Sequence, residues 1–234
     1  MKRARYSIVG LVFVAGCGRV DFDLADPDLI AWYQLETLGG GAASDSTGHR
    51  HTAVCDDAAT SCPRVVPGRH GNAMTFDGVD DRLVVGSSPA FSTAAFTVAF
   101  WVRLDLSPAN TGCLIGKVDG AATDNSWQVC INSPNNKLEF SSNSQTLSVA
   151  DVVSTGSWHH VAIRWDGTTK TESVDGADLV TAVAPISFDL GPIVIGADLD
   201  GGSLVAPIAA TLDEIRIYGR ALDASEIAEL AAPP

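Results

Sequence analysis

Short apolar segments recur along most of the chain and are separated by clusters of Gly, Asn, Asp and Pro. Many of these segments alternate apolar with polar residues and are rich in Val, Ile, Phe and Trp, as expected for β-strands with one buried face. The pattern predicts an all-β fold, either an antiparallel sandwich or a jelly roll. The expected strands are residues 29–35, 73–76, 82–85, 96–104, 113–118, 127–131, 137–141, 158–165, 171–174, 192–195 and 211–218.

Two of these segments show which side chains should face the core. In residues 96–102, Phe96, Val98, Phe100 and Val102 share one face, because side chains alternate along a strand. We expect this face to fill the space between two sheets. Trp101 lies on the opposite face, where it could pack beneath a loop.

The segment 158–165 alternates in the same way and carries two adjacent histidines. We expect His159, Val161, Ile163 and Trp165 to point inward and His160 to point outward. Neighbouring side chains on a strand leave on opposite faces, so the two histidines cannot share one metal ion in regular geometry. We interpret them as packing features.

A single helix is expected at the carboxyl end. The residues Asp223 to Glu226 form a capping-box-like start, and the helix should continue to Leu230. One terminal helix does not change the predicted fold class.

The amino terminus has the pattern of an export signal. Basic residues at positions 2, 3 and 5 precede an apolar run that ends in Ala15, Gly16 and Cys17. This order resembles a bacterial lipobox, which implies cleavage before Cys17 and lipidation of that cysteine. We therefore expect a signal peptide at 1–16, an acidic tether at 17–27 and one domain at 28–232, anchored by lipid in the bacterial cell envelope, at the outer membrane. The alternative is an ordinary secretory signal that leaves Cys17 as a free thiol.

Lipidation of Cys17 would leave four of the five cysteines. Cys55 and Cys62 bracket a short segment that suits a local disulfide. Cys113 and Cys130 lie on two apolar runs with a turn-rich stretch between them, so a hairpin would place them opposite each other. We predict both disulfides, since exported proteins meet an oxidising environment; buried free cysteines are the alternative.

The charge of the chain excludes one class of partner. Acidic residues number 28 against 15 Lys and Arg, and the formal net charge is −13. Removal of the basic signal segment would make the remaining chain more acidic still. Nucleic acid is not an expected partner, because phosphate binding needs clustered Lys and Arg.

Four ordered segments resemble the laminin-G-like domains of the concanavalin A-like lectin and glucanase superfamily. The resemblance covers nearly all of the chain after the signal, and it implies two curved antiparallel sheets packed face to face. The matching segments are residues 29–35 with 45–48, residues 71–81 with 96–102, residues 158–162 with 175–176, and residues 212–222 with the terminal helix.

The sequence contains no recognisable catalytic motif. Retaining glycosidases need two carboxylates about 5 Å apart, and related glucanases carry them as closely spaced Glu and Asp on one strand, a pattern that this sequence lacks. It also lacks a Gly-x-Ser-x-Gly elbow and a His-Glu-x-x-His zinc motif. We expect no enzymatic activity.

Calcium is the expected cofactor, on the strength of the resemblance. Related jelly rolls often hold a structural ion between an early turn and a carboxylate on the last strand. That precedent makes Asp77, Gly78 and Asp213 the candidate site, with Asp45 as a weaker member. Ca²⁺ prefers such oxygen ligands. The alternative for the first turn is that its aspartates simply cap it.

These features together predict a non-catalytic, membrane-tethered binding module that recognises a glycan or a protein at the cell envelope. A structural or assembly component of the envelope is the alternative, and a degenerate glycan hydrolase is a weaker one. Exposed aromatic residues on a concave face would favour glycan binding, and a flat apolar patch would favour a protein partner.

Overall fold

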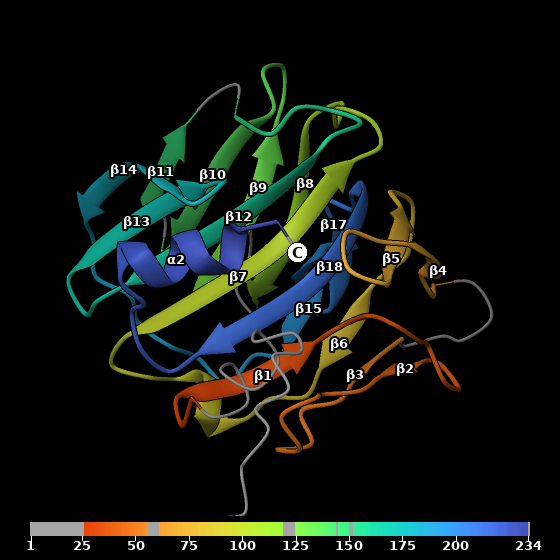
Figure 1. Cartoon of the computed structure of the whole chain (residues 1–234), viewed down its shortest axis with the longest axis horizontal. Helices are drawn as coiled ribbons and strands as arrows, with labels where there is room; N and C mark the ends of the chain where they lie inside the picture. The colour runs from red at the N-terminus through yellow and green to blue at the C-terminus, as the bar shows by residue number, and fades with distance from the viewer. Residues whose placement is uncertain (1–25, 56–60, 119–124, 144, 150–151, 234) are drawn as a thin grey trace, which may run out of the picture.

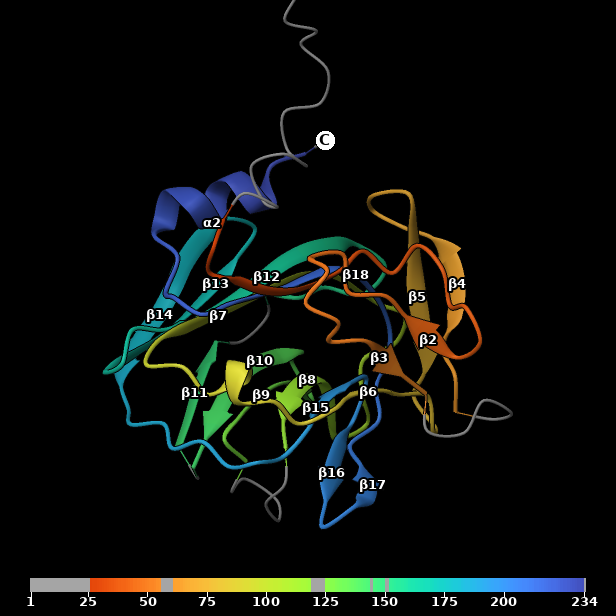
Figure 2. The same cartoon turned by 90° about the horizontal axis from the view of Figure 1, so that it is seen from below.

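Two antiparallel sheets stack face to face in the computed structural model, and one short helix lies outside the first of them (Figure 1; Figure 2). The structure describes residues 26–55, 61–118, 125–143, 145–149 and 152–233. The expected all-β class, the two antiparallel sheets and the terminal helix are confirmed. No helix within these described ranges is long and apolar enough to cross a membrane. The predicted signal peptide and Cys17 lie outside the described residues.

The sheet that carries the helix is called sheet A here. Its strands follow the order β14-β13-β12-β7-β18-β5-β4, and β1 also pairs with β18. The bounds are β14 (Ala177–Val183), β13 (Thr169–Val174), β12 (Trp158–Trp165), β7 (Phe96–Leu104), β18 (Ala209–Tyr218), β5 (Asn72–Asp77), β4 (Arg64–Pro67) and β1 (Leu29–Tyr33).

The opposite sheet, sheet B, has the order β11-β10-β9-β8-β15-β6-β3-β2. A two-stranded hairpin stands apart from both sheets. The bounds of the strands in sheet B are β11 (Gln145–Val149), β10 (Lys137–Ser142), β9 (Trp127–Asn132), β8 (Thr111–Lys117), β15 (Ile193–Ile195), β6 (Leu83–Val85), β3 (Ala53–Val54) and β2 (Ala42–Ala43). The hairpin consists of β16 (Asp198–Asp200) and β17 (Ser203–Val205). A short 3-10 helix at Pro89–Phe91 follows β6.

The core lies between the two sheets and follows the alternation in the sequence. The four inward residues predicted for β7 are all buried there, together with Val161, Ile163 and Trp165 of β12. Burial of such side chains is the main source of stability for a sandwich of this kind. The predicted facing of both strands is confirmed.

A second, smaller apolar cluster attaches the helix α2 (Ala224–Ala231) to the outer face of sheet A. Ile227 and Leu230 of the helix pack with Trp32 of β1 and Tyr218 of β18. The predicted capping box is present, because the Asp223 side chain accepts the Glu226 backbone N–H and the Glu226 side chain accepts the Asp223 N–H. The helix thus covers one end of this face.

Both predicted disulfides are present. Cys113 of β8 and Cys130 of β9 are direct partners across the strand pair, and Cys55 is bonded to Cys62. Cross-linking a loop of this kind contributes about 3 kcal/mol in the chain-entropy model.

Candidate functional site

A β-bulge in the last strand brings two consecutive carboxylates to the outer face of sheet A. The register of β18 against β7 shifts between Asp213 and Arg216, and Glu214 has a φ of 54°. Leu212 on one side of the bulge and Ile215 on the other both point into the core. Asp213 and Glu214 therefore leave the strand on the same outward side, which regular alternation would forbid.

Glu214 is held by two neighbours on this face. Its Oε2 atom accepts a hydrogen bond from Trp32 Nε1 at 2.9 Å and pairs with Arg216 at 2.7 Å. The Arg216 guanidinium lies over the Trp32 ring, 4.5 Å from its centre, and Arg69 lies over Trp101 in the same way at 4.6 Å. Each tryptophan thus has a cation over one face of its ring, which is a favourable cation–π arrangement.

Asp213 is fully buried behind the loop that joins β4 to β5. Its Oδ2 atom accepts the backbone N–H groups of Arg69 at 2.8 Å and His70 at 2.9 Å, while Oδ1 is buried without a hydrogen-bond partner. Burial, with the nearby charges of Glu214 and Glu36, raises the pKa of Asp213 to about 7 in spite of those hydrogen bonds. The carboxyl group therefore keeps its proton to a much higher pH than an exposed aspartate does.

A small pocket opens beside these carboxylates; we call it the β1–β18 pocket. Its volume is about 220 Å³, and it is lined by two tryptophans, by side chains that donate or accept hydrogen bonds, and by one residue of α2. The Glu36 carboxylate is fixed at its rim by the Asn72 N–H, at 2.9 Å. The lining residues are Trp32, Gln34, Glu36, His70, Gly71, Trp101, Glu214, Arg216 and Leu230.

The predicted early turn is a separate acidic cluster. Ligand atoms of Asp77, Asp80 and Asp81 lie within 4.8 Å of one another, so the cluster could hold a metal ion. The same residues also cap the turn: Asp77 Oδ1 accepts the N–H groups of Val79 and Asp80, and Asp81 Oδ2 accepts that of Asp77. Gly78 has a φ of 77°, and a Cβ at that position would lie 2.9 Å from the Ala209 nitrogen. The turn geometry therefore requires glycine.

The structure does not bring Asp77 and Asp213 together. Asp77 pairs with Ala209 in the β5–β18 ladder, and Met74 pairs with Leu212. Asp213 is thus about four residues, or roughly 13 Å, away from Asp77 along the strands. Each carboxylate belongs to its own environment, and the two cannot ligate the same ion.

Asp45, the weaker candidate, serves its own loop. Its two carboxylate oxygens accept N–H groups from Trp32, Thr47 and His51, at 3.0 to 3.2 Å. Burial alone would raise the pKa of Asp45, but the hydrogen bonds that its carboxylate accepts have the larger effect, so its pKa lies below the usual value. This carboxylate fixes the loop that follows β1.

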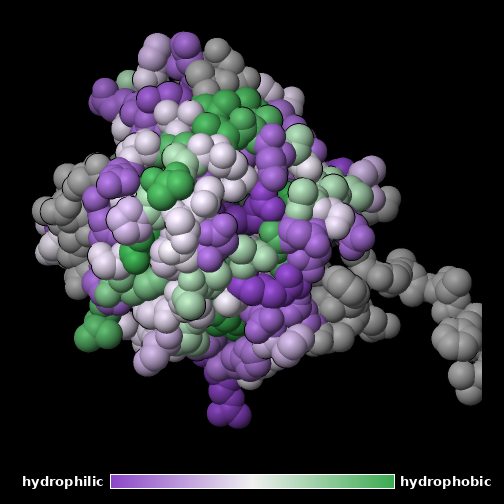
Figure 3. Space-filling view, turned by 90° about the vertical axis from the view of Figure 1, so that its left-hand side faces the viewer, coloured by the Kyte–Doolittle hydropathy of each residue, from purple (hydrophilic) through white to green (hydrophobic). Residues whose placement is uncertain are grey.

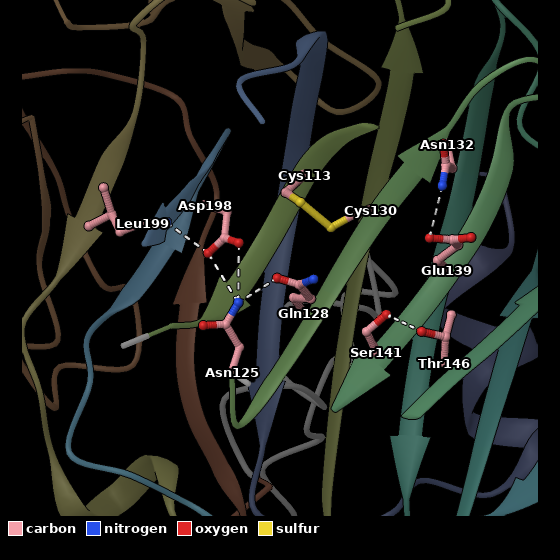
Figure 4. The surroundings of a disulfide bond; sticks show 10 residues. All are labelled: Cys113, Asn125, Gln128, Cys130, Asn132, Glu139, Ser141, Thr146, Asp198 and Leu199. Atoms are coloured by element: carbon pink, nitrogen blue, oxygen red, sulfur yellow. Dashed lines mark hydrogen bonds between the residues drawn. A yellow bond between two sulfur atoms is a disulfide. The ribbon is translucent and has the colours of Figure 1, made fainter. Parts of the chain in front are cut away.

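A polar row on the outer face of sheet B surrounds the Cys113–Cys130 disulfide (Figure 4). The Asn125 amide donates to Gln128 at 2.6 Å and to both carboxylate oxygens of Asp198 at 3.2 Å. Burial raises the pKa of Asp198 to about 6. These side chains bind one another and fix the base of the β16–β17 hairpin to sheet B.

A family comparison agrees with this architecture. A family model, Laminin_G_3, described as the concanavalin A-like lectin/glucanases superfamily, matches residues 77–228. The chain belongs to this superfamily. Neuronal pentraxin-2 of Mus musculus is 30% identical over 148 residues, which are 58% of this chain and 34% of the relative. The chain thus spans about a third of the length of the curated relatives that it matches.

Solved structures of other proteins show the same fold. Domain 4 of AbnA, an extracellular GH43 arabinanase of Geobacillus stearothermophilus solved with arabinotriose, matches with a TM-score of 0.68 and 22% identity over 88% of this chain and 98% of that one. A Trypanosoma rangeli sialidase matches with a TM-score of 0.70 and 17% identity over 87% of this chain and 32% of the enzyme. At these identities the likeness shows the fold alone.

Proposed function

We propose that this chain is a glycan-binding module, tethered to a membrane of the bacterial cell envelope, and that the β1–β18 pocket receives one sugar unit. The observation that carries the proposal is the composition of the pocket. Sugar hydroxyls both donate and accept hydrogen bonds. Glu36 and Glu214 supply acceptors, Arg216 supplies donors, and Gln34 supplies both.

The size of the pocket favours a small unit or the end of a chain. Pockets for drug-sized ligands span about 300 to 1,000 Å³, and this one has about 220 Å³. Because Trp32 and Trp101 are both buried and each has a guanidinium over one face of its ring, recognition would rest on hydrogen bonds rather than on stacking. The structure of AbnA domain 4 with arabinotriose supports a glycan as the ligand class.

The surface on the β14 side favours a glycan over a protein partner. Figure 3 shows this side with its apolar residues in small groups that polar residues separate. Exposed large side chains such as Leu179, Val183 and Leu190 do occur in the described part of the chain, but the view shows no continuous apolar patch. Protein interfaces usually present such a patch at their centre.

A binding measurement on the mature chain, kept soluble by Cys17→Ser, tests the proposal. A glycan array should identify ligands, and Glu36→Gln should weaken binding by about 10- to 100-fold, because a hydrogen bond to a charged group contributes about 1.5 to 3 kcal/mol. Glu139→Gln, on the outer face of sheet B, is the matched control and should bind as well as the unmodified chain. If Glu36→Gln and Glu139→Gln bind the glycan equally well, the pocket is not the binding site. If the chain captures a specific protein and binds no glycan, its ligand is a protein.

The membrane tether belongs to the same proposal. The described chain begins at Asp26, nine residues after Cys17, so a lipid on Cys17 would hold the domain within about 30 Å of the membrane. Arg220 binds Asp26 at 2.6 Å and Glu226 of α2 at 2.6 Å, which fixes the start of the domain beside the helix (Figure 2). Cys17→Ser should move the protein from the membrane fraction to the soluble fraction.

We also propose that Ca²⁺ binds the acidic turn of Asp77, Asp80 and Asp81. Three carboxylates within 4.8 Å fit the preference of this ion for several oxygen ligands, and the backbone hydrogen bonds engage one named oxygen each of Asp77 and Asp81. The ion would stabilise the turn. Melting with and without chelator tests this, and an unchanged midpoint would argue against a structural ion.

A further inference from the structure

Three side chains from different segments form a hydrogen-bonded chain at one end of β12. Ser154 lies in the loop before β12, His159 is the second residue of β12, and Asp175 lies in the turn between β13 and β14. Ser154 Oγ is 2.8 Å from His159 Nε2, and His159 Nδ1 is 2.8 Å from Asp175 Oδ2. The atoms are connected in the order that a serine nucleophile, its general base and an orienting carboxylate require.

The surrounding backbone fixes the tautomer of the imidazole. The Ser154 backbone N–H donates to His159 Nε2 at 3.2 Å. Because an N–H group can only donate, Nε2 carries a lone pair and Nδ1 carries the proton that goes to Asp175. This is the tautomer in which a histidine can accept the proton of a serine hydroxyl.

Asp175 is held in place independently of the histidine. Its Oδ1 atom accepts the His160 backbone N–H at 2.9 Å, and its own φ is 52°. The two carboxylate oxygens therefore have separate partners, one on the backbone of β12 and one on the imidazole. The carboxylate keeps the ring oriented, so Asp175 acts as a positioning residue.

We propose that Ser154, His159 and Asp175 form an acyl-transfer centre that hydrolyses small acyl esters. Ser154 Oγ attacks the ester carbonyl carbon, and His159 Nε2 takes the hydroxyl proton. The carbon–oxygen bond to the alcohol then breaks, and His159 returns the proton to that leaving oxygen. Water attacks the acyl-serine in the same way, which releases the carboxylic acid and restores the serine.

The accessibility of the centre defines the class of substrate. Ser154 and Asp175 are exposed, and the His159 side chain is 16% exposed. The nucleophile thus stands at the surface and can reach a short acyl group, such as acetyl, that projects from a larger soluble or cell-surface molecule. This activity is independent of the proposed glycan pocket and of its residues.

Two probes test the centre on the mature chain made soluble by Cys17→Ser. A fluorophosphonate should label Ser154, as shown by peptide mass spectrometry, because Oγ displaces fluoride from phosphorus and His159 accepts the proton. The chain should also hydrolyse p-nitrophenyl acetate. Ser154→Ala should lower the hydrolysis rate by at least about 100-fold, the scale of general-base catalysis.

The matched control is Ser157→Ala, which changes an exposed serine of the same loop and should keep both labelling and hydrolysis. Asp175→Asn retains the positive φ, which asparagine tolerates, and should lower kcat with little change in KM. Unchanged melting curves for these variants would show that loss of activity does not reflect unfolding.

Three results would overturn the proposal. The first is the absence of a label on Ser154 in the folded chain. The second is hydrolysis that survives Ser154→Ala and disappears with His159→Gln, which would show a bare imidazole reaction. The third is full activity of Asp175→Asn. Glycan binding should be the same in all these variants, so failure of this proposal and failure of the binding proposal can be distinguished.

Discussion

The ionisation of Asp213 should make the stability of the domain depend on pH in a way that one substitution removes. Asp213 is fully buried and its pKa is raised from 3.8 to about 7, chiefly by burial. Between these two values the folded state binds a proton that the unfolded state has already lost. Protons therefore stabilise the fold in this range, and this stabilisation is lost as the pH rises from about 4 through about 7.

The size of the effect follows from the pKa difference. One pKa unit corresponds to about 1.4 kcal/mol, so a shift of about three units costs the folded state roughly 4 kcal/mol once the pH exceeds 7. Asp213→Asn keeps an oxygen acceptor for the Arg69 and His70 N–H groups but does not ionise. The variant should therefore gain stability relative to the unmodified chain as the pH rises from 5 to 8.

Urea unfolding at pH 5, 6, 7 and 8, with chelator present, measures this difference. Other buried carboxylates titrate in both proteins, so the difference between the two curves isolates Asp213. Only about two of the three pKa units lie between pH 5 and pH 7, so the gain at pH 8 relative to pH 5 should be about 2.6 kcal/mol, which corresponds to roughly 5 to 10 °C in melting temperature. A difference between the two proteins that stays constant from pH 5 to pH 8 would refute the reasoning.

Substitutions at three further positions examine other buried or strained parts of the fold. Burial raises the pKa of Glu172 to about 8, so Glu172→Gln should gain stability relative to the unmodified chain between pH 6 and pH 9, as followed by urea unfolding. Gly196 has a φ of 91° and a Cβ there would collide with the Phe76 ring, so Gly196→Ala should lower the free energy of unfolding by about 3 kcal/mol; a normal melting curve would contradict the structure. Glu214 has a positive φ at the bulge, so Glu214→Gly should be more stable than Glu214→Ala by about 1 kcal/mol in denaturant titrations, the reverse of the usual order in a strand.

Strong alternation made the central strands predictable, and weak alternation hid the edge strands. β7 and β12 each bury a continuous apolar face against the opposite sheet, and the alternating apolar residues in their sequences predict that burial. β14 is exposed or half-buried at every position, so it leaves no such pattern, and residues 177–183 were not predicted as a strand. Asp198–Asp200 resembles a loop in composition, yet it forms β16 by pairing with β17, and the Asn125 amide binds Asp198 across 73 residues.

The candidate site was less predictable, because non-local pairing assembles it. The sequence analysis placed Asp213 in one calcium site with the turn of Asp77, and the register of β18 against β5 separates the two carboxylates. Glu36, which lies after β1, and His70, which lies in a distant loop, meet at the pocket only once β1 and β5 have both paired with β18. Similarly, His159 was expected to be a packing residue, and its contacts with Ser154 and Asp175 follow from a loop and a turn whose positions the sequence pattern does not specify.

The bulge in β18 explains how one strand can fill the core and also build a polar site. Regular alternation would have sent Glu214 toward the apolar interior, where a lone carboxylate is very costly. One extra residue reverses the phase, so Ile215 and Ile217 still reach the core while Glu214 binds Trp32 and Arg216 outside it. A positive φ at a non-glycine residue costs about 1 to 3 kcal/mol, and the two contacts of Glu214 offset that cost. The backbone strain at Glu214, the reversal of side-chain alternation along β18 and the polar lining of the pocket thus all arise from the bulge at Asp213 and Glu214.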